Sequence, residues 1–313
     1  MSDLCERVRA TVQEMRDAGR VAEALGELLT AWSENLRRQV TSYSSYSSYE
    51  QELVRPQILA SFIDLETVLE AINSDRKTAN ATVRELLEES LQKVVPPGTR
   101  TEVLIVLSVL NFSSLRSAAK LTASELGFIL LLSSVTDYAA PPFLPRVVHE
   151  AVHGNRDMIQ LCENPNIRQK HLGEVMCDSV ALILSGPVFL HSMEALMTLV
   201  GPGAAQRVTP SHPSMAARAS VLESVALRLW SRTKTPQLVA EIMRPIQDVK
   251  CAADELVDQE YYRGQALAKL SAYQPLGPGE AVWQEIYAAS NYNRQGSILV
   301  GMNIDFAQRR AGS

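Results

Sequence analysis

Histidine and cysteine are scarce in this sequence. Its 313 residues include 5 His and 4 Cys, and no two cysteines lie in a CxxC pair. This spacing argues against a four-cysteine zinc ribbon and against an iron–sulfur cluster. Any metal site must therefore take its ligands from the few histidines and from carboxylates. We also expect a reducing, cytoplasmic compartment, because neither a disulfide framework nor a signal peptide is evident.

Other absences narrow the function further. No GxSxG, Walker A or GxGxxG motif occurs, so serine hydrolases, P-loop proteins and Rossmann enzymes have no support. The longest apolar stretch, about 179–205, is interrupted by His191, Glu194 and two Gly-Pro pairs, whereas a transmembrane helix needs about 18 uninterrupted residues. The net charge of −5 argues against nucleic acid as a partner. We therefore expect no nucleic-acid and no membrane partner, and membrane attachment is the less favoured alternative.

What is present is an ordinary globular composition, with 46% hydrophobic and 21% charged residues. Apolar residues at helical spacing predict helices over 2–40 and 51–95. The Ser/Tyr repeat at 42–49 is interpreted as a flexible connection between them, with tyrosine phosphorylation as the alternative. Pro96-Pro97-Gly98 ends this part of the chain. We therefore predict a helical N-terminal region over 1–95, a second domain over 96–235, and a mainly helical C-terminal region over 236–313.

Short apolar segments follow the proline break. Residues 101–112 and 128–135 are apolar and partly β-branched, which is typical of buried strands, although buried helices fit the same pattern. Beyond a proline-rich loop, we predict helices over 144–161 and 168–184 and across much of 214–270. The expected fold class is α+β, predominantly helical, with a small sheet ahead of the helix over 144–161.

That helix carries His149-Glu150-Ala151-Val152-His153, an HExxH motif. Four residues advance a helix by slightly more than one turn, so both imidazoles project from the same face. They can then bind one Zn²⁺ at about 2.0–2.1 Å each. Glu150 adjoins the first histidine, where it is placed to act as general base by taking a proton from water.

A catalytic zinc ion needs a third protein ligand. The metzincin position, six residues after His153, holds Ile159, so that family does not fit. In gluzincins the third ligand is a glutamate of a later helix, and a resemblance to that family implies Glu174 on the next predicted helix. Asp178 follows one turn later, where it is placed to accept a hydrogen bond from the far nitrogen of His149.

Other candidates in this region have simpler interpretations. His171 precedes Glu174 by one turn and is the alternative third ligand. Cys162 and Cys177 flank the same region, and we interpret both as small buried hydrophobic residues rather than as redox or inhibitory thiols.

HExxH followed by ExxxD resembles the gluzincin metallopeptidases. A further segment, His212-Pro213-Ser214-Met215-Ala216-Ala217-Arg218, resembles the HPPxxxR segment of the membrane endopeptidases related to the CAAX prenyl proteases and the HtpX heat-shock proteases. The resemblance covers about a third of the chain, roughly 128–222. It implies a zincin-like metallopeptidase domain over 96–235 and a Zn²⁺ cofactor.

The resemblance also implies a role for each residue of these motifs. His149, His153 and Glu174 would be the metal ligands, and Glu150 the general base. Asp178 would support a ligand, His212 would stabilise the oxyanion, and Arg218 would lie beside His212.

Two departures limit the resemblance. Ser214 replaces the second proline of the family segment, and flanking transmembrane helices are not evident. We therefore expect a soluble zinc metallopeptidase acting on a peptide or protein substrate. The alternative is a non-catalytic helical binding or scaffold protein with a structural or vestigial zinc site, whose N-terminal helices contact a partner or a second copy. A peptidase that stays inactive until a partner or stress signal arrives fits the same sequence.

Overall fold

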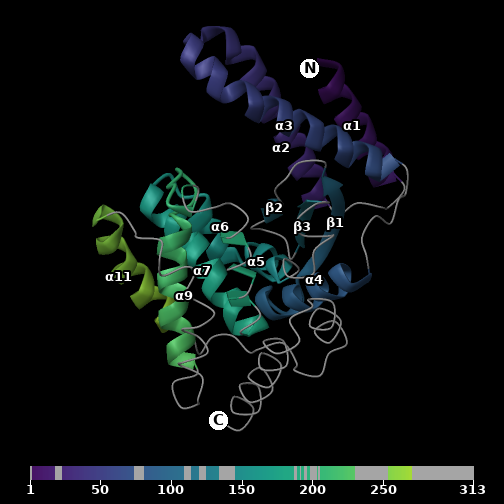
Figure 1. Cartoon of the computed structure of the whole chain (residues 1–313). Coiled ribbons are helices and arrows are strands. Elements are labelled where there is room, and N and C mark those ends of the chain that lie inside the picture. The colour runs from purple at the N-terminus through teal and green to yellow at the C-terminus, as the bar shows by residue number, and fades with distance from the viewer. Residues whose placement is uncertain are drawn as a thin grey trace. The chain divides into compact units, whose positions relative to one another are not determined.

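The chain is described by a computed structural model in which helices predominate and one small sheet is present, as the α+β expectation requires. The described residues are 2–17, 23–73, 81–108, 114–119, 125–133, 145–186, 189–190, 192–193, 196–197, 203, 205–229 and 253–269. Figure 1 labels their helices and strands. No helix within these residues is both long and apolar enough to cross a membrane.

The chain forms two compact units that do not coincide with the predicted domain boundaries. The first unit joins 1–80 to 97–136, and the second joins 81–96 to 137–313. The segment after the proline break, predicted to open the second domain, therefore groups with the N-terminal helices. Conversely, the last helix of the predicted N-terminal region groups with the helices that follow.

The first unit is built on three helices: α1 (Ser2–Asp17), α2 (Glu23–Ser42) and α3 (Ser48–Asn73). Their apolar positions recur at helical spacing and meet in one core with residues of the sheet. This core contains Leu4, Val8, Val12, Leu25, Leu29, Trp32, Leu36, Leu65, Val68, Leu69, Ala71, Ile72, Val106 and Ile129.

The Ser/Tyr repeat does connect two helices, through the short 3-10 helix η1 (Tyr43–Ser45). A capping box then starts α3. The backbone N–H of Ser47 donates to Glu50 Oε2 at 2.8 Å, and the N–H of Glu50 donates to Ser47 Oγ at 3.3 Å. The sequence S-x-x-E therefore sets where this helix begins.

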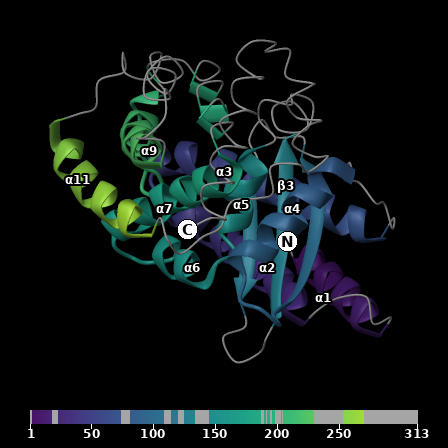
Figure 2. The ribbon, with the colours of Figure 1, turned by 90° about the horizontal axis from the view of Figure 1, so that it is seen from below.

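The sheet has three strands, β1 (Arg100–Ser108), β2 (Ser114–Ala119) and β3 (Glu125–Ser133), in the order β1-β3-β2. β3 pairs in parallel with β1 and antiparallel with β2, and the strands are seen beside each other in Figure 2. β1 and β3 confirm the two predicted strands, whereas β2 was not predicted because its sequence SLRSAA is poor in β-branched residues. Val106 and Ile129 pack into the helical core, which explains why the sheet belongs to the first unit.

The second unit contains α4 (Ala81–Val94), α5 (Arg146–Val152), α6 (Arg156–Cys162), α7 (Ile167–Ser185), α9 (Met215–Leu229) and α11 (Ala253–Ala268). Helix α7 contacts α5, α6, α9 and α11, and every residue from 171 to 185 is buried. It is therefore the central helix of this unit. Of the predicted C-terminal region over 236–313, α11 and Lys269 are the described part.

The single helix predicted over 144–161 is wrong, because the chain breaks after the HExxH motif. His153 is the C-cap of α5, and Asn155 starts α6 with extended backbone and a side chain that accepts from the N–H of Asp157 at 2.9 Å. The amide of Asn155 also donates to the carbonyl of Val94 at 2.7 Å, which joins the break to the end of α4. Asparagine at an N-cap thus overrides the continuous helical pattern.

Candidate metal centre

Three side-chain donors from α5, its C-cap and α7 converge in the second unit. His149 Nε2 lies 3.1 Å from His153 Nε2, and Glu174 Oε2 lies 3.6 Å from the first nitrogen and 3.7 Å from the second. A triangle with these sides has a centre about 2.0 Å from each corner, which matches zinc-like bond lengths to imidazole nitrogen and carboxylate oxygen. His149, His153 and Glu174 can therefore hold one metal ion.

Glu174 Oε2 is an unsatisfied acceptor in this group. It is buried without a hydrogen-bond partner among the described residues. Burial favours the neutral acid, but the charges of His153 and His149 outweigh it and hold the pKa of Glu174 well below its ordinary value. A buried carboxylate that faces imidazoles and lacks a hydrogen bond suits a cation.

Asp178 supports His149 from behind. Its Oδ1 lies 2.9 Å from His149 Nδ1. A proton on Nδ1 would leave the lone pair of Nε2 facing the donor triangle. The structure thus places Asp178 beside the far nitrogen of His149, as predicted from the sequence. His149 also stacks on Phe189, with ring centroids 6.5 Å apart.

Arg218 on α9 contacts the same carboxylate. Its Nε donates to Asp178 Oδ2 at 2.6 Å and its Nη2 to Oδ1 at 2.7 Å. Burial would raise the pKa of Asp178, but the charge and hydrogen bonds of Arg218, followed by His149, lower it to about 2. Arg218, expected beside His212, therefore connects to the donor triangle through Asp178 and His149.

His212 lies on the loop before α9 and is half-exposed. Its Nε2 is 3.4 Å from Glu174 Oε2, and its Nδ1 is 2.8 Å from Ser211 Oγ. If Ser211 donates this bond, Nε2 carries the ring proton and points it toward the donor triangle. Burial lowers the pKa of His212, and this outweighs the opposing charge of Glu174, so the neutral form is favoured.

His171, the alternative third ligand, is not one of the converging donors. It is buried, and its Nε2 lies 2.8 Å from the carbonyl oxygen of Thr209. Thr209 in turn exchanges hydrogen bonds with His212: the N–H of His212 donates to Thr209 Oγ1 at 2.9 Å, and the N–H of Thr209 donates to the carbonyl of His212 at 2.9 Å. His171 thus anchors the loop that carries His212, a role that sequence spacing does not reveal.

Glu150, the predicted general base, is buried on α5 beside His149. Burial lowers the pKa of His153, but the charge of Glu174, the hydrogen bond of Cys162 and the charge of Glu150 together raise it to about 10. Glu150 therefore lies within electrostatic range of the donor triangle.

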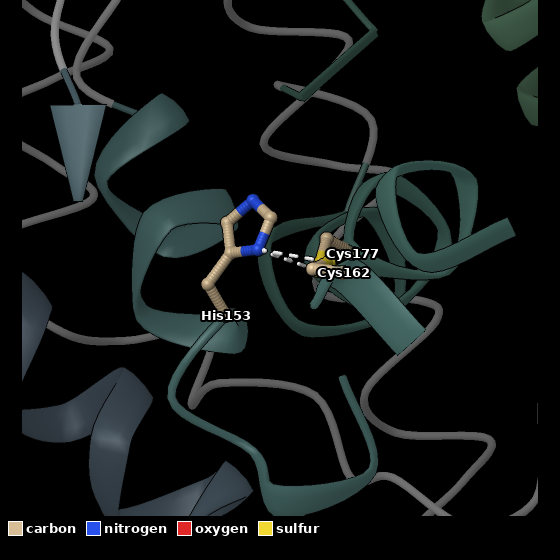
Figure 3. Close-up of side chains that lie close together, drawn as sticks. All are labelled: His153, Cys162 and Cys177. Atoms are coloured by element: carbon tan, nitrogen blue, oxygen red, sulfur yellow. Dashed lines mark hydrogen bonds between the residues drawn. The ribbon is translucent and has the colours of Figure 1, made fainter. Parts of the chain in front are cut away.

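Two cysteines complete the surroundings of His153 in a way the sequence did not predict. Cys162 Sγ and Cys177 Sγ each lie 3.5 Å from His153 Nδ1, as Figure 3 shows. Cys177 is fully buried and Cys162 partly so. A hydrogen bond from Cys177, together with His153, lowers the pKa of Cys162 to about 6. The spacing of 15 residues between the two thiols carries no recognisable signal, because a turn and a helix break separate them.

Comparison of the chain with protein-family models, with curated proteins and with solved structures finds no match. The functional argument therefore rests on the geometry of this site.

Proposed function

We propose that this chain is a zinc metallopeptidase with a zincin-like fold, and that His149, His153 and Glu174 hold the Zn²⁺ ion. The observation that carries the proposal is the donor triangle with sides of 3.1, 3.6 and 3.7 Å. Two imidazoles and one carboxylate are a typical ligand set of catalytic zinc, which keeps a fourth position open. His212 is not among the converging donors in the described part of the chain, which agrees with an open position.

Each side chain then has a chemical task. A bound zinc ion would supply Lewis-acid activation of water and of a peptide carbonyl. Glu150 takes a proton from the attacking water and delivers it to the leaving amine. The Nε2–H of neutral His212 donates to the oxyanion that develops on the carbonyl oxygen. Asp178, held by Arg218, keeps His149 in the tautomer that binds metal.

The decisive test replaces the base and leaves the ligands intact. Glu150→Gln should retain about one zinc per chain but lose roughly 10²–10⁴ in the rate of peptide cleavage, measured with an unbiased peptide library. Glu163→Gln is the matched control, because Glu163 is exposed at the end of α6 and should leave the rate unchanged. Full activity of Glu150→Gln, or a wild-type protein that binds no zinc, would refute the proposal.

The 3.4 Å separation of His212 Nε2 and Glu174 Oε2 favours one rival, a closed structural site in a binding protein. A small shift of the half-exposed His212 would make it a fourth ligand, and four protein ligands are typical of structural zinc. His212→Ala separates the two functions. If His212 donates to the oxyanion, the variant should keep zinc and lose roughly 10²–10³ in kcat. If His212 is a fourth ligand, the variant should bind zinc more weakly.

A further inference from the structure

The imidazole of His153 has donors on both sides. Its Nε2 faces His149 and Glu174 at 3.1 and 3.7 Å, whereas its Nδ1 faces the two sulfur atoms at 3.5 Å each. In Figure 3 both contacts run to the same ring nitrogen, and the other nitrogen points away from the cysteines. The sulfurs therefore lie behind the donor triangle and are not part of it.

In the metal-free chain these contacts are hydrogen bonds between the thiols and the ring nitrogen. The same spacing also fits a bound cation. A tetrahedral ion with bonds of about 2.0–2.1 Å to nitrogen and about 2.3 Å to sulfur would hold the two kinds of donor about 3.5 Å apart. Both observed Nδ1–Sγ distances have this value, and all three donor atoms lie within 4.8 Å of one another.

The fold makes room for this cluster at one glycine. A Cβ on Gly173 would lie 2.6 Å from Cys162 Sγ and 3.1 Å from the backbone nitrogen of the same cysteine. Any larger residue would push α6 away from α7 and carry Cys162 with it. The close approach of the two helices therefore brings Cys162 to the buried Cys177 and to His153.

We propose that His153 Nδ1, Cys162 Sγ and Cys177 Sγ form a second metal site, selective for a thiophilic cation of the zinc class. Thiolate and imidazole are ligands that such ions prefer, and a water molecule would complete a tetrahedral site. When both sites are filled, the ring of His153 bridges the two ions, and its remaining proton and the two thiol protons leave to solvent. The ion would tie α6 to α7 and hold His153 in place. This site does not depend on peptidase activity.

Cobalt is the probe, because Co²⁺ replaces zinc and thiolate-to-cobalt charge transfer absorbs in the near ultraviolet. The full chain, reduced and freed of metal, is titrated with Co²⁺ without oxygen. We expect two ions per chain and a charge-transfer band. Cys162→Ser/Cys177→Ser should bind one ion and lose the band, whereas Glu174→Gln should weaken the first site and keep the band. Cys162→Ser alone and Gly173→Ala should weaken the band, which covers the case that the double variant misfolds.

Two control variants locate the signal. Cys5→Ser changes a thiol of the first unit that contacts the carbonyl of Ser33, and Cys251→Ser changes the fourth cysteine of the sequence, so both should keep the band. A wild-type chain that binds one ion without the band, or a band that survives in the double variant, would overturn the second site. Those results leave the Glu150→Gln test untouched, and loss of peptidase activity in Glu150→Gln leaves the band untouched, so the two proposals fail separately.

Discussion

Two arginine–carboxylate pairs, one in each unit, have the same chemistry and opposite surroundings. In the first unit Arg7 donates to both oxygens of Glu66 at 2.9 and 2.8 Å, with side chains 48% and 29% exposed. In the second unit Arg218 likewise donates to both oxygens of Asp178, but these side chains are only 10% and 0% exposed. The first pair joins α1 to α3 at the surface, and the second lies in the interior beside His149 of the candidate metal centre.

The difference extends to the rest of each unit. Among the described residues, Asp64 is the one charged side chain buried in the first unit, whereas the second unit buries His149, Glu150, His171, Glu174, Asp178 and Arg218. Burying charge is costly unless every group is paired. The first unit is thus organised as an apolar core with a charged surface, and the second accepts that cost to build a site.

The largest contrast should come from removing one carboxylate of each pair in the metal-free protein. Asp178→Ala leaves the buried Arg218 without a partner and should cost about 3–5 kcal/mol in the second unit. Glu66→Ala removes a solvated pair and should cost no more than about 1 kcal/mol in the first. Hydrogen exchange followed by mass spectrometry on peptides from α7 and α3 reports each unit separately. Equal losses would erase the distinction between the two pairs.

Acid should act mainly on the second unit. The folded pKa of Asp178, about 2, lies below its unfolded value of about 3.9, so the stability it contributes is present above pH ~4 and is lost as pH falls toward 2. The contribution is about 2–3 kcal/mol. Asp178→Asn should flatten this loss, and urea midpoints between pH 2 and 6 measure it. The pKa of surface Glu34 is lowered by Arg37 and Arg9, and that effect should fade in high salt, whereas the Asp178 effect should not.

In the metal-free chain, His153 should cause a loss of stability at alkaline pH. Its folded pKa of about 10 lies above the unfolded value of about 6.5, so its contribution is present below pH ~6.5 and is lost as pH rises toward 10. His153→Gln should remove this alkaline loss of stability, whereas the control His212→Gln should not. Urea midpoints between pH 6 and 10 measure both variants.

Glycine positions should show a smaller contrast. Gly173→Ala drives a methyl group against the sulfur and backbone of Cys162 and should cost about 1–3 kcal/mol in the second unit. Gly26→Ala in α2 meets Cγ1 of the Val12 side chain at 3.0 Å and no backbone atom closer than that, and the gain in helix propensity of up to about 1 kcal/mol offsets that contact. Thermal unfolding of both variants tests this pair, and a Gly173→Ala protein as stable as wild type would show that α6 can move without cost.

Features that depend on local spacing were accessible from the sequence. Positions one turn apart on a helix must share a face, so His149 with His153, and Glu174 with Asp178, could be paired from their spacing alone. The strands β1 and β3 were recognisable as apolar runs. In each case the physical cause lies within a few residues.

Features that depend on packing between distant segments were not accessible. The sheet joined the N-terminal helices because Val106 and Ile129 fit their core, and an apolar strand does not specify its partner. The helix break at Asn155 replaced one helix by two, and that break aims α6 so that Cys162 meets His153. Neither cysteine carries a motif, so their convergence emerges only when α6 packs on α7.

The smallest expected change in stability comes from removing one partly buried hydrogen bond in each unit, and only one of the two variants should also affect the reaction rate. His171→Leu removes the bond to the Thr209 carbonyl, 2.8 Å long, and Ser61→Ala removes the acceptor of the Trp32 Nε1–H, at 2.7 Å. Each should cost about 0.5–1.5 kcal/mol. The peptidase rate should fall only in His171→Leu, because Thr209 holds His212, and His171→Gln should restore part of it by returning a donor. An unchanged rate in His171→Leu would mean that the His212 loop keeps its position without this anchor. The buried His171 would then contribute to stability alone.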